Sequence, residues 1–326
     1  MTIKSCFITS LLAGCLLFNN AQTQTLPVAF DIFVDYSVID NINTQPLRGL
    51  AVVSSEWALN QSENIWLSGS LIAYTGDNGS ELLGDWQGFD NIDASDQISL
   101  YQALIGFKPQ ENWQILLGQI EANDHFAFTD HGGLFLNSSM GFSPSINGLS
   151  SYPDTQLGLV ANYQTDNLGI SAGVFKIHNQ ESQRFDQLQQ IVQLTLPMNS
   201  VTMRLGIWQA PDDTRSLKGA YAVVDWQMAR KLSAFVMLAN NDKDSINIAH
   251  SHLGAGVQYD NVFDSNISLG AGYTQAKLEN DKESVVEFFI HLPINQYLKI
   301  TPDLQWIKLA DQSSHKVLTL RSNITF

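Results

Sequence analysis

Residues 28–38 read VAFDIFVDYSV, with an apolar or aromatic residue at every even position. Polar residues, among them Asp31, Asp35 and Ser37, fall at odd positions. Successive side chains of a β-strand point to opposite faces, so a period of two predicts a strand with one apolar and one polar face. The stretch therefore predicts a strand that separates an apolar environment from a wet one.

The same alternation recurs as far as the C-terminus. Positions 286, 288, 290 and 292 are apolar and face away from Glu287 and His291. No segment after residue 25 has a 3.6-residue hydrophobic period of useful length, so the chain is predicted to be all-β. The sixteen predicted strands span 28–38, 48–59, 65–75, 96–107, 113–121, 155–164, 167–177, 187–196, 200–209, 218–228, 231–239, 249–259, 266–277, 284–293, 297–308 and 317–326.

The lengths of the connections alternate. Those after even-numbered strands are short, as at 108–112, 197–199 and 294–296, whereas those after odd-numbered strands include two long ones, 76–95 and 122–154. Short periplasmic turns and long extracellular loops are typical of outer-membrane barrels, which have an even number of strands. The sequence therefore predicts one transmembrane antiparallel β-barrel domain of 16 strands over residues 22–326, with extracellular loops at 76–95 and 122–154.

Residues 1–21 have the pattern of a secretory signal peptide. Lys4 precedes an apolar core from Cys6 to Phe18, and Ala21 offers a small residue for cleavage. The segment holds both cysteines of the chain, so the mature protein is predicted to have no thiol chemistry. LAGC at 12–15 also resembles a lipoprotein cleavage box ending at Cys15, but the apolar residues that follow it favour cleavage near Ala21. We expect export to the bacterial outer membrane.

Composition excludes two classes of protein. The chain has 17 Lys and Arg against 32 Asp and Glu, a net charge of −15, and no basic cluster, which argues against nucleic-acid binding. No apolar run of 18 residues follows the N-terminus, which argues against a helical membrane protein. Charged residues make up 15% of the chain, against about 25% in soluble proteins. A membrane protein whose apolar residues alternate with polar ones along its strands fits these facts best.

The C-terminal strand is predicted to end at an aromatic residue. Leu318, Leu320, Ile324 and Phe326 share one face. A terminal aromatic resembles the last strand of outer-membrane barrels, which implies Phe326 as a contact for the barrel-assembly machinery. The apolar outer wall is expected to meet outer-membrane lipid and lipopolysaccharide. Four tryptophans near predicted strand ends suit an interfacial girdle: Trp57, Trp113, Trp226 and Trp306.

The polar faces of the strands predict a wet lumen. Barrels of about 16–18 strands leave an aqueous channel that side chains do not fill, so we expect passive diffusion of small hydrophilic solutes. Arg204 and Asp225 lie at similar predicted height on neighbouring strands, as do Glu287 and Asp303. Opposite charges across a lumen orient dipolar solutes. The alternative interpretation is that charges in the lumen serve only solvation. The predicted wall residues of the pathway are Arg204, Asp225, Glu287, Lys299 and Asp303.

Several motifs resemble the carbohydrate-selective porins of the OprB family. They are GDWQGFDNID at 84–93, LYQA at 100–103, LGQIEANDHF at 117–126, FLNSSMGFSP at 135–144 and, after Val286-Glu287, ITPDLQW at 300–306. The GDWGG-type segment followed by Arg that often opens members is missing before the first strand. The resemblance implies a 16-stranded channel whose loops narrow the pore and favour sugars.

A sugar pathway needs carboxylates, amides and aromatic faces, because sugars present hydroxyls and apolar ring faces. The loop at 122–154 follows the fifth strand, where general porins fold a loop inward, and the loop at 76–95 can complete the rim. An alternative interpretation is that Asp124 and Asn137 cap turns and that the two phenylalanines pin the loop to the wall. The predicted loop residues of the pathway are Asp85, Trp86, Glu121, Asp124, His125, Phe126, Phe135 and Asn137.

No catalytic constellation is legible, so we expect a protein that is not an enzyme and has no cofactor. His250 and His252 resemble half a metal site but lack a third ligand, so no metal is predicted. The leading hypothesis is a sugar-permeable porin, as a monomer or homotrimer. Two alternatives remain: a general or cation-preferring porin, and a closed barrel that acts as a structural or adhesive anchor.

Overall fold

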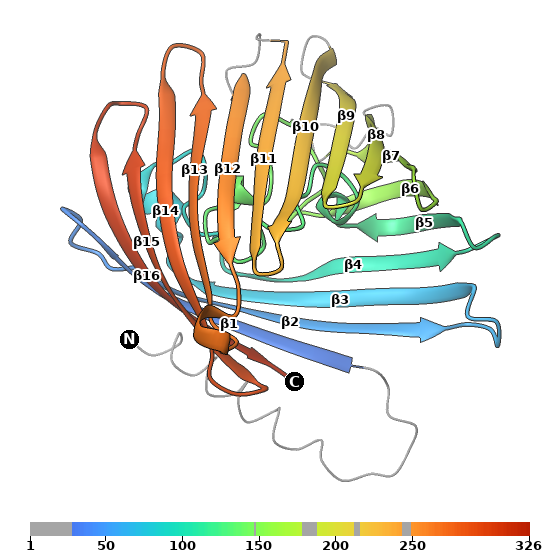
Figure 1. The fold of residues 1–326 in the computed structure, drawn as a ribbon, viewed down its shortest axis with the longest axis horizontal. Helices are drawn as coiled ribbons and strands as arrows, with labels where there is room; N and C mark the ends of the chain where they lie inside the picture. The colour runs from blue at the N-terminus through green and yellow to red at the C-terminus, as the bar shows by residue number, and fades with distance from the viewer. Residues whose placement is uncertain (1–27, 147, 178–187, 212–215, 243–248) are drawn as a thin grey trace.

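The computed structural model describes residues 28–146, 148–177, 188–211, 216–242 and 249–326, so the signal peptide predicted at 1–21 lies outside the described residues. Sixteen antiparallel strands form a closed barrel in which each strand pairs with its neighbours in sequence and β1 pairs with β16 (Figure 1). The predicted fold class is confirmed, and every predicted strand boundary lies within three residues of the observed one. The strands are β1 (Val28–Ile39), β2 (Leu47–Ala58), β3 (Ile65–Gly76), β4 (Gln97–Phe107), β5 (Trp113–Ile120), β6 (Gln156–Gln164), β7 (Gly169–Lys176), β8 (Leu188–Met198), β9 (Val201–Pro211), β10 (Ser216–Ala229), β11 (Leu232–Asn241), β12 (Ser251–Tyr259), β13 (Ser268–Lys277), β14 (Lys282–Pro293), β15 (Leu298–Lys308) and β16 (Ser314–Thr325).

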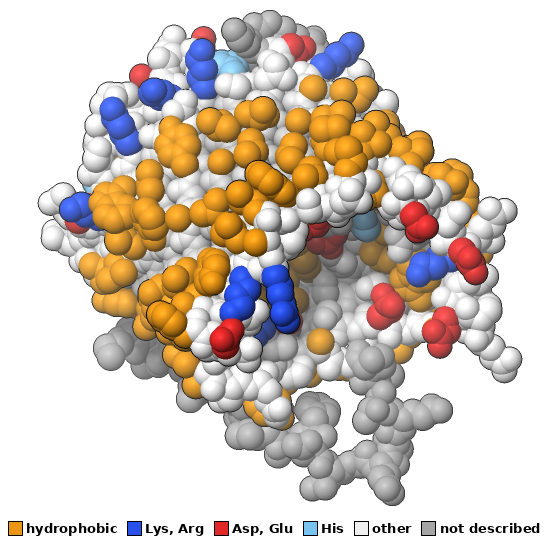
Figure 2. Space-filling view, in the orientation of Figure 1, with side chains coloured by type: hydrophobic (Ala, Val, Ile, Leu, Met, Phe, Trp, Pro, Cys, Tyr) orange, Lys and Arg blue, Asp and Glu red, His pale blue; other side chains and the backbone are white. Residues whose placement is uncertain are grey.

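The alternation in sequence becomes an apolar outer wall and a polar inner wall. On β1, Tyr36 and Val38 are exposed on the outside, whereas Asp35 and Ser37 are buried on the inside. Figure 2 shows apolar side chains gathered in a broad band over the outer wall, the arrangement that a barrel surrounded by lipid requires. The helices of the described residues are short: α2 (Gly79–Leu83), η1 (Ala122–Asp124), η2 (Ser138–Met140) and η3 (Val262–Asp264). Among the described residues, no helix has the length and apolarity needed to cross a membrane.

Two long connections fold into the barrel. The first long loop, residues 77–96, joins β3 to β4, and the second long loop, residues 121–155, joins β5 to β6. They are bonded to each other: Asn91 N donates to Leu136 O at 2.8 Å, and Ser138 N donates to Gly88 O at 2.8 Å. The two loops therefore form one layer inside the lumen.

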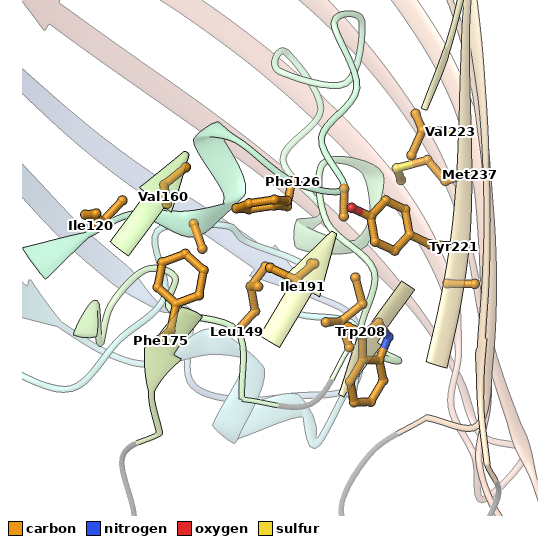
Figure 3. Packing of buried hydrophobic residues seen from close by; sticks show 14 of the residues in the cluster. Ile120, Phe126, Leu149, Val160, Phe175, Ile191, Trp208, Tyr221, Val223 and Met237 are labelled. Carbon is orange, nitrogen blue, oxygen red and sulfur yellow. The ribbon is translucent and has the colours of Figure 1, made fainter. Parts of the chain in front are cut away.

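The hydrophobic core lies between this layer and the wall. Figure 3 shows Phe126 and Leu149 of the second long loop among Val160, Phe175 and Ile191, which point inward from β6, β7 and β8. A second cluster places Phe89 of the first long loop against Val285, Ile307 and Val317 of the opposite wall. The barrel is thus packed on the sides that the loops cover.

The two ends of the barrel differ. The connections after even-numbered strands, such as 59–64, 108–112 and 294–297, are short and lie at one rim, which we call the short-turn mouth. Figure 2 shows the molecule hollowed at this mouth, with acidic and histidine side chains visible inside the hollow. The lumen is therefore open to solvent from the short-turn side.

Candidate functional site

The second long loop begins with a buried carboxylate. Glu121 accepts hydrogen bonds from Tyr101 Oη at 2.5 Å, Tyr152 N at 2.8 Å and Asn123 N at 3.1 Å. Through the last of these it caps η1. Burial raises the pKa of Glu121 to about 7, although the bond from Tyr101 opposes the rise. Glu121 therefore holds the start of the loop in place and changes its charge near neutral pH.

Phe126 pins the loop to the wall, as the alternative interpretation of the sequence proposed. Its ring is fully buried and lies edge-on to Phe175 of β7, with centroids 6.1 Å apart. Next to it, Ala127 N donates to Gln193 Oε1 on β8 at 3.0 Å. A solute in the lumen does not meet this ring, because the loop backbone and the wall enclose it.

Phe135 plays the same part farther along the loop. Its ring meets Phe235 of β11 and Phe289 of β14 edge-on, with centroid separations of 5.7 Å and 4.9 Å. Gly272 of β13 leaves room for it, because a Cβ there would come within 2.7 Å of both Phe135 and Met140. Phe135 is therefore an anchor that inserts into a gap in the wall.

Arg204 and Asp225 form an ion pair between β9 and β10. Both also hold the loop: Arg204 Nη2 donates to both carboxylate oxygens of Asp130 at 2.8 Å, and Asp225 Oδ1 accepts from Thr129 Oγ1 at 2.5 Å. The guanidinium lies over the ring of Phe128, 4.1 Å from its centroid. The pair is buried, whereas 43% of the Asp130 side chain stays exposed, so Asp130 is the member of this group that solutes can reach.

Glu287 of β14 is another loop anchor. It accepts from Leu136 N at 2.5 Å and lies near Asn137 N, while Asn137 Nδ2 donates to Gln305 Oε1 at 3.3 Å. The Asn137 side chain caps η2. Asp303 accepts from Gln305 Nε2 at 3.0 Å. All of these side chains are buried. Their predicted contact with a solute is untested, and this packing does not favour it.

The first long loop is held in the same way, by another glutamate of the same strand. Glu283 of β14 accepts from Trp86 N at 3.0 Å and from Gln87 N at 2.9 Å. The Trp86 ring is exposed. Burial raises the pKa of Asp85 well above its usual range, and the neighbouring Glu283 adds to the rise.

Asp90, on the same loop, lies between two arginines. It accepts from Arg48 Nε of β2 at 3.0 Å and from Arg321 Nη2 of β16 at 2.9 Å. Arg321 also bonds Asp35 of β1, with Nη2 2.6 Å from Oδ2. Burial alone would raise the pKa of Asp90, but the two guanidinium groups outweigh it and lower that pKa. The loop is therefore tied across the seam where β16 meets β1.

An open cavity of about 420 Å³ lies at the short-turn mouth, along the inner wall of β2–β5. Asp124 and His125 reach it from the second long loop, and Gln102 Nε2 donates to Asp124 Oδ2 at 3.3 Å. Burial raises the pKa of Asp124 and lowers the pKa of His125. The lining residues are Glu56, Ala58, Glu63, Trp66, Ser68, Gln102, Leu104, Lys108, Gln114, Leu116, Asp124 and His125.

The structure thus places the predicted residues in different surroundings. Buried side chains are those of Glu121, Phe126, Phe135, Asn137, Arg204, Asp225, Glu287 and Asp303. On the first long loop, Asp85 is half-buried and Trp86 is exposed. Asp124 and His125 lie together at the cavity. Lys299 stands apart near the short-turn end of β15, opposite Pro293 in register.

The sequence did not single out several residues that hold the loops or line the cavity. Arg48, Glu283 and Gln193 are polar residues on the inward faces of their strands, as Glu287 is. Nothing in the sequence distinguishes them from the other inward polar residues. Asp130 and Trp66 belong to the lumen only through contacts or a cavity that the fold creates. Among the described residues, no group of three or more His, Cys, Asp or Glu side chains is placed to hold a metal ion.

A closed 16-stranded barrel with loops folded inside defines the class of outer-membrane porins, and solved porins share this fold. OprB of Pseudomonas putida, solved at low pH, has a TM-score of 0.63 at 14% identity and covers 92% of this chain and 91% of its own. OmpT of Vibrio cholerae, in its trimer form, has a TM-score of 0.63 at 9% identity over 93% of this chain and 99% of that one. A mutant porin of Rh. blastica has a TM-score of 0.62 at 8% identity, covering 93% and 100%.

A sequence model of the carbohydrate-selective porins, the OprB family, matches residues 62–234 and 209–326. The chain therefore belongs to the OprB family of carbohydrate-selective porins. It is an outer-membrane channel for the diffusion of small hydrophilic solutes. A search of curated proteins gave no match.

Proposed function

We propose that this porin passes small carbohydrates along the inner wall of β2–β5, between that wall and the second long loop. The cavity at the short-turn mouth is the observation that carries the proposal. It presents the amides of Gln102 and Gln114, exposed carboxylates and an indole, which are groups that bind sugar hydroxyls and ring faces.

The loop anchors support this route. Wall residues on β8, β10 and β14 bond the second long loop, and residues on β2, β14 and β16 bond the first. The side of the lumen along β2–β5 at the short-turn mouth is left open. The two loops thereby narrow the lumen that a 16-stranded barrel would otherwise leave wide.

The experiment is conductance of the purified protein in planar bilayers, with current block by added glucose or maltose. We expect open channels and a sugar-dependent block. Replacing Gln102 and Gln114 by leucine should weaken the block about tenfold, because each lost hydrogen bond is worth about 0.5–1.5 kcal/mol. Gln312→Leu, in the exposed 309–313 turn, is the matched control, and sugars should block its current as they block that of the wild type.

Each alternative has its own outcome. Current without any sugar block would favour a general porin, and a barrel that inserts without conducting would favour a closed anchor. The acidic composition favours a cation preference, since acidic rings favour cations. A reversal potential that indicates anion selectivity in a KCl gradient would contradict that part of the proposal.

The cellular context is also proposed. We infer export with cleavage of a signal peptide near Ala21, barrel assembly through Phe326, and an outer wall in contact with lipid and lipopolysaccharide. A monomer or homotrimer is expected, and the similarity to OmpT in its trimer form supports testing for trimers by crosslinking in membranes.

A further inference from the structure

The cavity at the short-turn mouth, which we call the vestibule, has the dimensions of a binding site. Its volume of about 420 Å³ lies within the range of about 300–1,000 Å³ that small-molecule sites occupy. Strands β2 and β3 line one side, β4 and β5 the other, and the start of the second long loop lies at its inner end. A single sugar can therefore rest there before it leaves the barrel.

The vestibule is negatively charged. Glu56 projects inward from β2, Glu63 lies in the 59–64 turn, and Asp124 reaches in from the loop; Glu56 and Glu63 are exposed. Lys108 is the basic residue in the lining. His125 contributes no lasting positive charge at pH 7, because burial lowers its pKa below the usual 6.5. The lining carboxylates thus outnumber the lining cations.

The vestibule also contains an aromatic face that already holds an ammonium group. The Trp66 indole lies against Gly106 of β4, where a Cβ would clash with the ring, so glycine allows the indole to lie flat on the wall. Lys108 Nζ stands 5.3 Å from the centroid of the Trp66 ring. Ammonium groups are attracted to the face of tryptophan. Trp66 is buried and Lys108 lies over its ring, so the ammonium of a ligand is stabilised on this ring only where it displaces Lys108.

We propose that the vestibule is a selectivity site that favours sugars carrying an ammonium group, such as glucosamine, and disfavours sugar acids. The inference rests on the proposed sugar route and adds the charge class of the sugar. The ammonium pairs with Glu56, Glu63 or Asp124 in charge-assisted hydrogen bonds, and the amides of Gln102 and Gln114 meet the hydroxyls. A carboxylate on the sugar meets repulsion at the same place.

The test is tracer influx into proteoliposomes containing the full chain, in buffered salt, with glucosamine, glucose and glucuronate at equal concentrations. We expect glucosamine to enter fastest and glucuronate slowest, with the two differing about tenfold. The triple variant Glu56→Gln, Glu63→Gln and Asp124→Asn should reduce this ratio at least threefold. The matched control, Glu279→Gln, Asp281→Asn and Asp311→Asn, removes three exposed acids from the 278–281 and 309–313 turns at the opposite rim and should keep the wild-type ratio.

A second variant is expected to increase the preference for glucosamine, which a misfolded protein would not do. Lys108→Gln removes the competing ammonium over Trp66, so the preference for glucosamine should increase. Equal influx of the three sugars, or an equal effect of the two triple variants, overturns the inference while leaving the sugar route standing. Absence of influx for all three sugars overturns the sugar route itself, and the inference with it.

Discussion

At the scale of single residues, the two loops depend on carboxylates that accept backbone N–H groups. Glu121, Glu283 and Glu287 each bond the backbone of a loop, and Asp225 accepts from the backbone of Asp130. Because these bonds involve backbone N–H groups of the loop, few side chains of the loop are needed to hold it in place.

Glu121 makes this attachment sensitive to pH. Its pKa rises from 4.5 to about 7 in the docked loop, so docking favours the protonated form. Docking should therefore be strongest below about pH 4.5, weaken as the pH rises from there to about 7, and lose in total an amount of the order of 3 kcal/mol. Hydrogen exchange of the second long loop, corrected for intrinsic rates, should show more protection at pH 5 than at pH 8.

The matched variants for this prediction are Glu121→Gln and Glu111→Gln. The first removes the titrating group and should make protection equal at the two pH values. The second lies exposed in the 108–112 turn and should leave the wild-type difference in place. A pH difference that survives in Glu121→Gln would assign the effect to another group.

At the scale of elements, the first long loop acts on the seam between β1 and β16. The strands pair there from Asp31 to Ile39, as in any ladder of the barrel. In addition, Asp90 accepts hydrogen bonds from both Arg48 and Arg321, and Arg321 also donates to Asp35. A loop that connects β3 to β4 therefore ties β2 to β16. A loop that narrows the pore thus also fastens the first and last strands together.

We predict that Asp90→Asn destabilises the barrel by about 3–5 kcal/mol, the usual cost of removing one partner from a buried ion pair. The urea midpoint for unfolding in lipid vesicles should fall, and single-channel conductance should rise as the first long loop detaches. Asp281→Asn, exposed in the 278–281 turn, serves as the control and should change neither quantity. An unchanged midpoint in Asp90→Asn would show that the network around the two arginines does not stabilise the seam.

At the scale of the whole molecule, closure of the barrel satisfies the main-chain groups that lipid cannot hydrogen-bond. The last residue takes part directly. Phe326 N donates to Phe30 O at 2.9 Å, Phe30 N donates to Phe326 O at 3.2 Å, and the Phe326 ring stacks on Tyr297 with centroids 5.9 Å apart. The C-terminal aromatic is therefore part of the finished seam as well as a proposed assembly signal.

Deletion of Phe326 should reduce the yield of folded barrel in the outer membrane, because it removes two seam hydrogen bonds and the apolar end of β16. Heat-modifiable migration on gels measures the folded fraction. Phe326→Tyr keeps the backbone and an aromatic ring, and should assemble normally. A deletion variant that migrates like the wild type would show that neither role is needed.

The sequence allowed the strands to be predicted, but not the positions of the loops against the wall. Alternation of apolar and polar residues is local, so Tyr36 and Asp35 reveal opposite faces without any knowledge of the fold. The docking of Leu136 on Glu287 joins residues 151 positions apart, and no local pattern encodes it. For the same reason Arg48 and Glu283 were not singled out, although they bond a loop just as Glu287 does.

The sequence by itself determined the number of strands, their order and which side chains face inward, because each follows from a period of two and from the lengths of the connections. Only the tertiary structure decided which inward polar residues meet water. Glu287 and Glu56 are both carboxylates on inward faces, yet the loop layer covers Glu287 completely, whereas Glu56 remains exposed in the vestibule. The physical reason is that a strand pattern fixes the direction of a side chain, while its exposure depends on what a distant segment places over it.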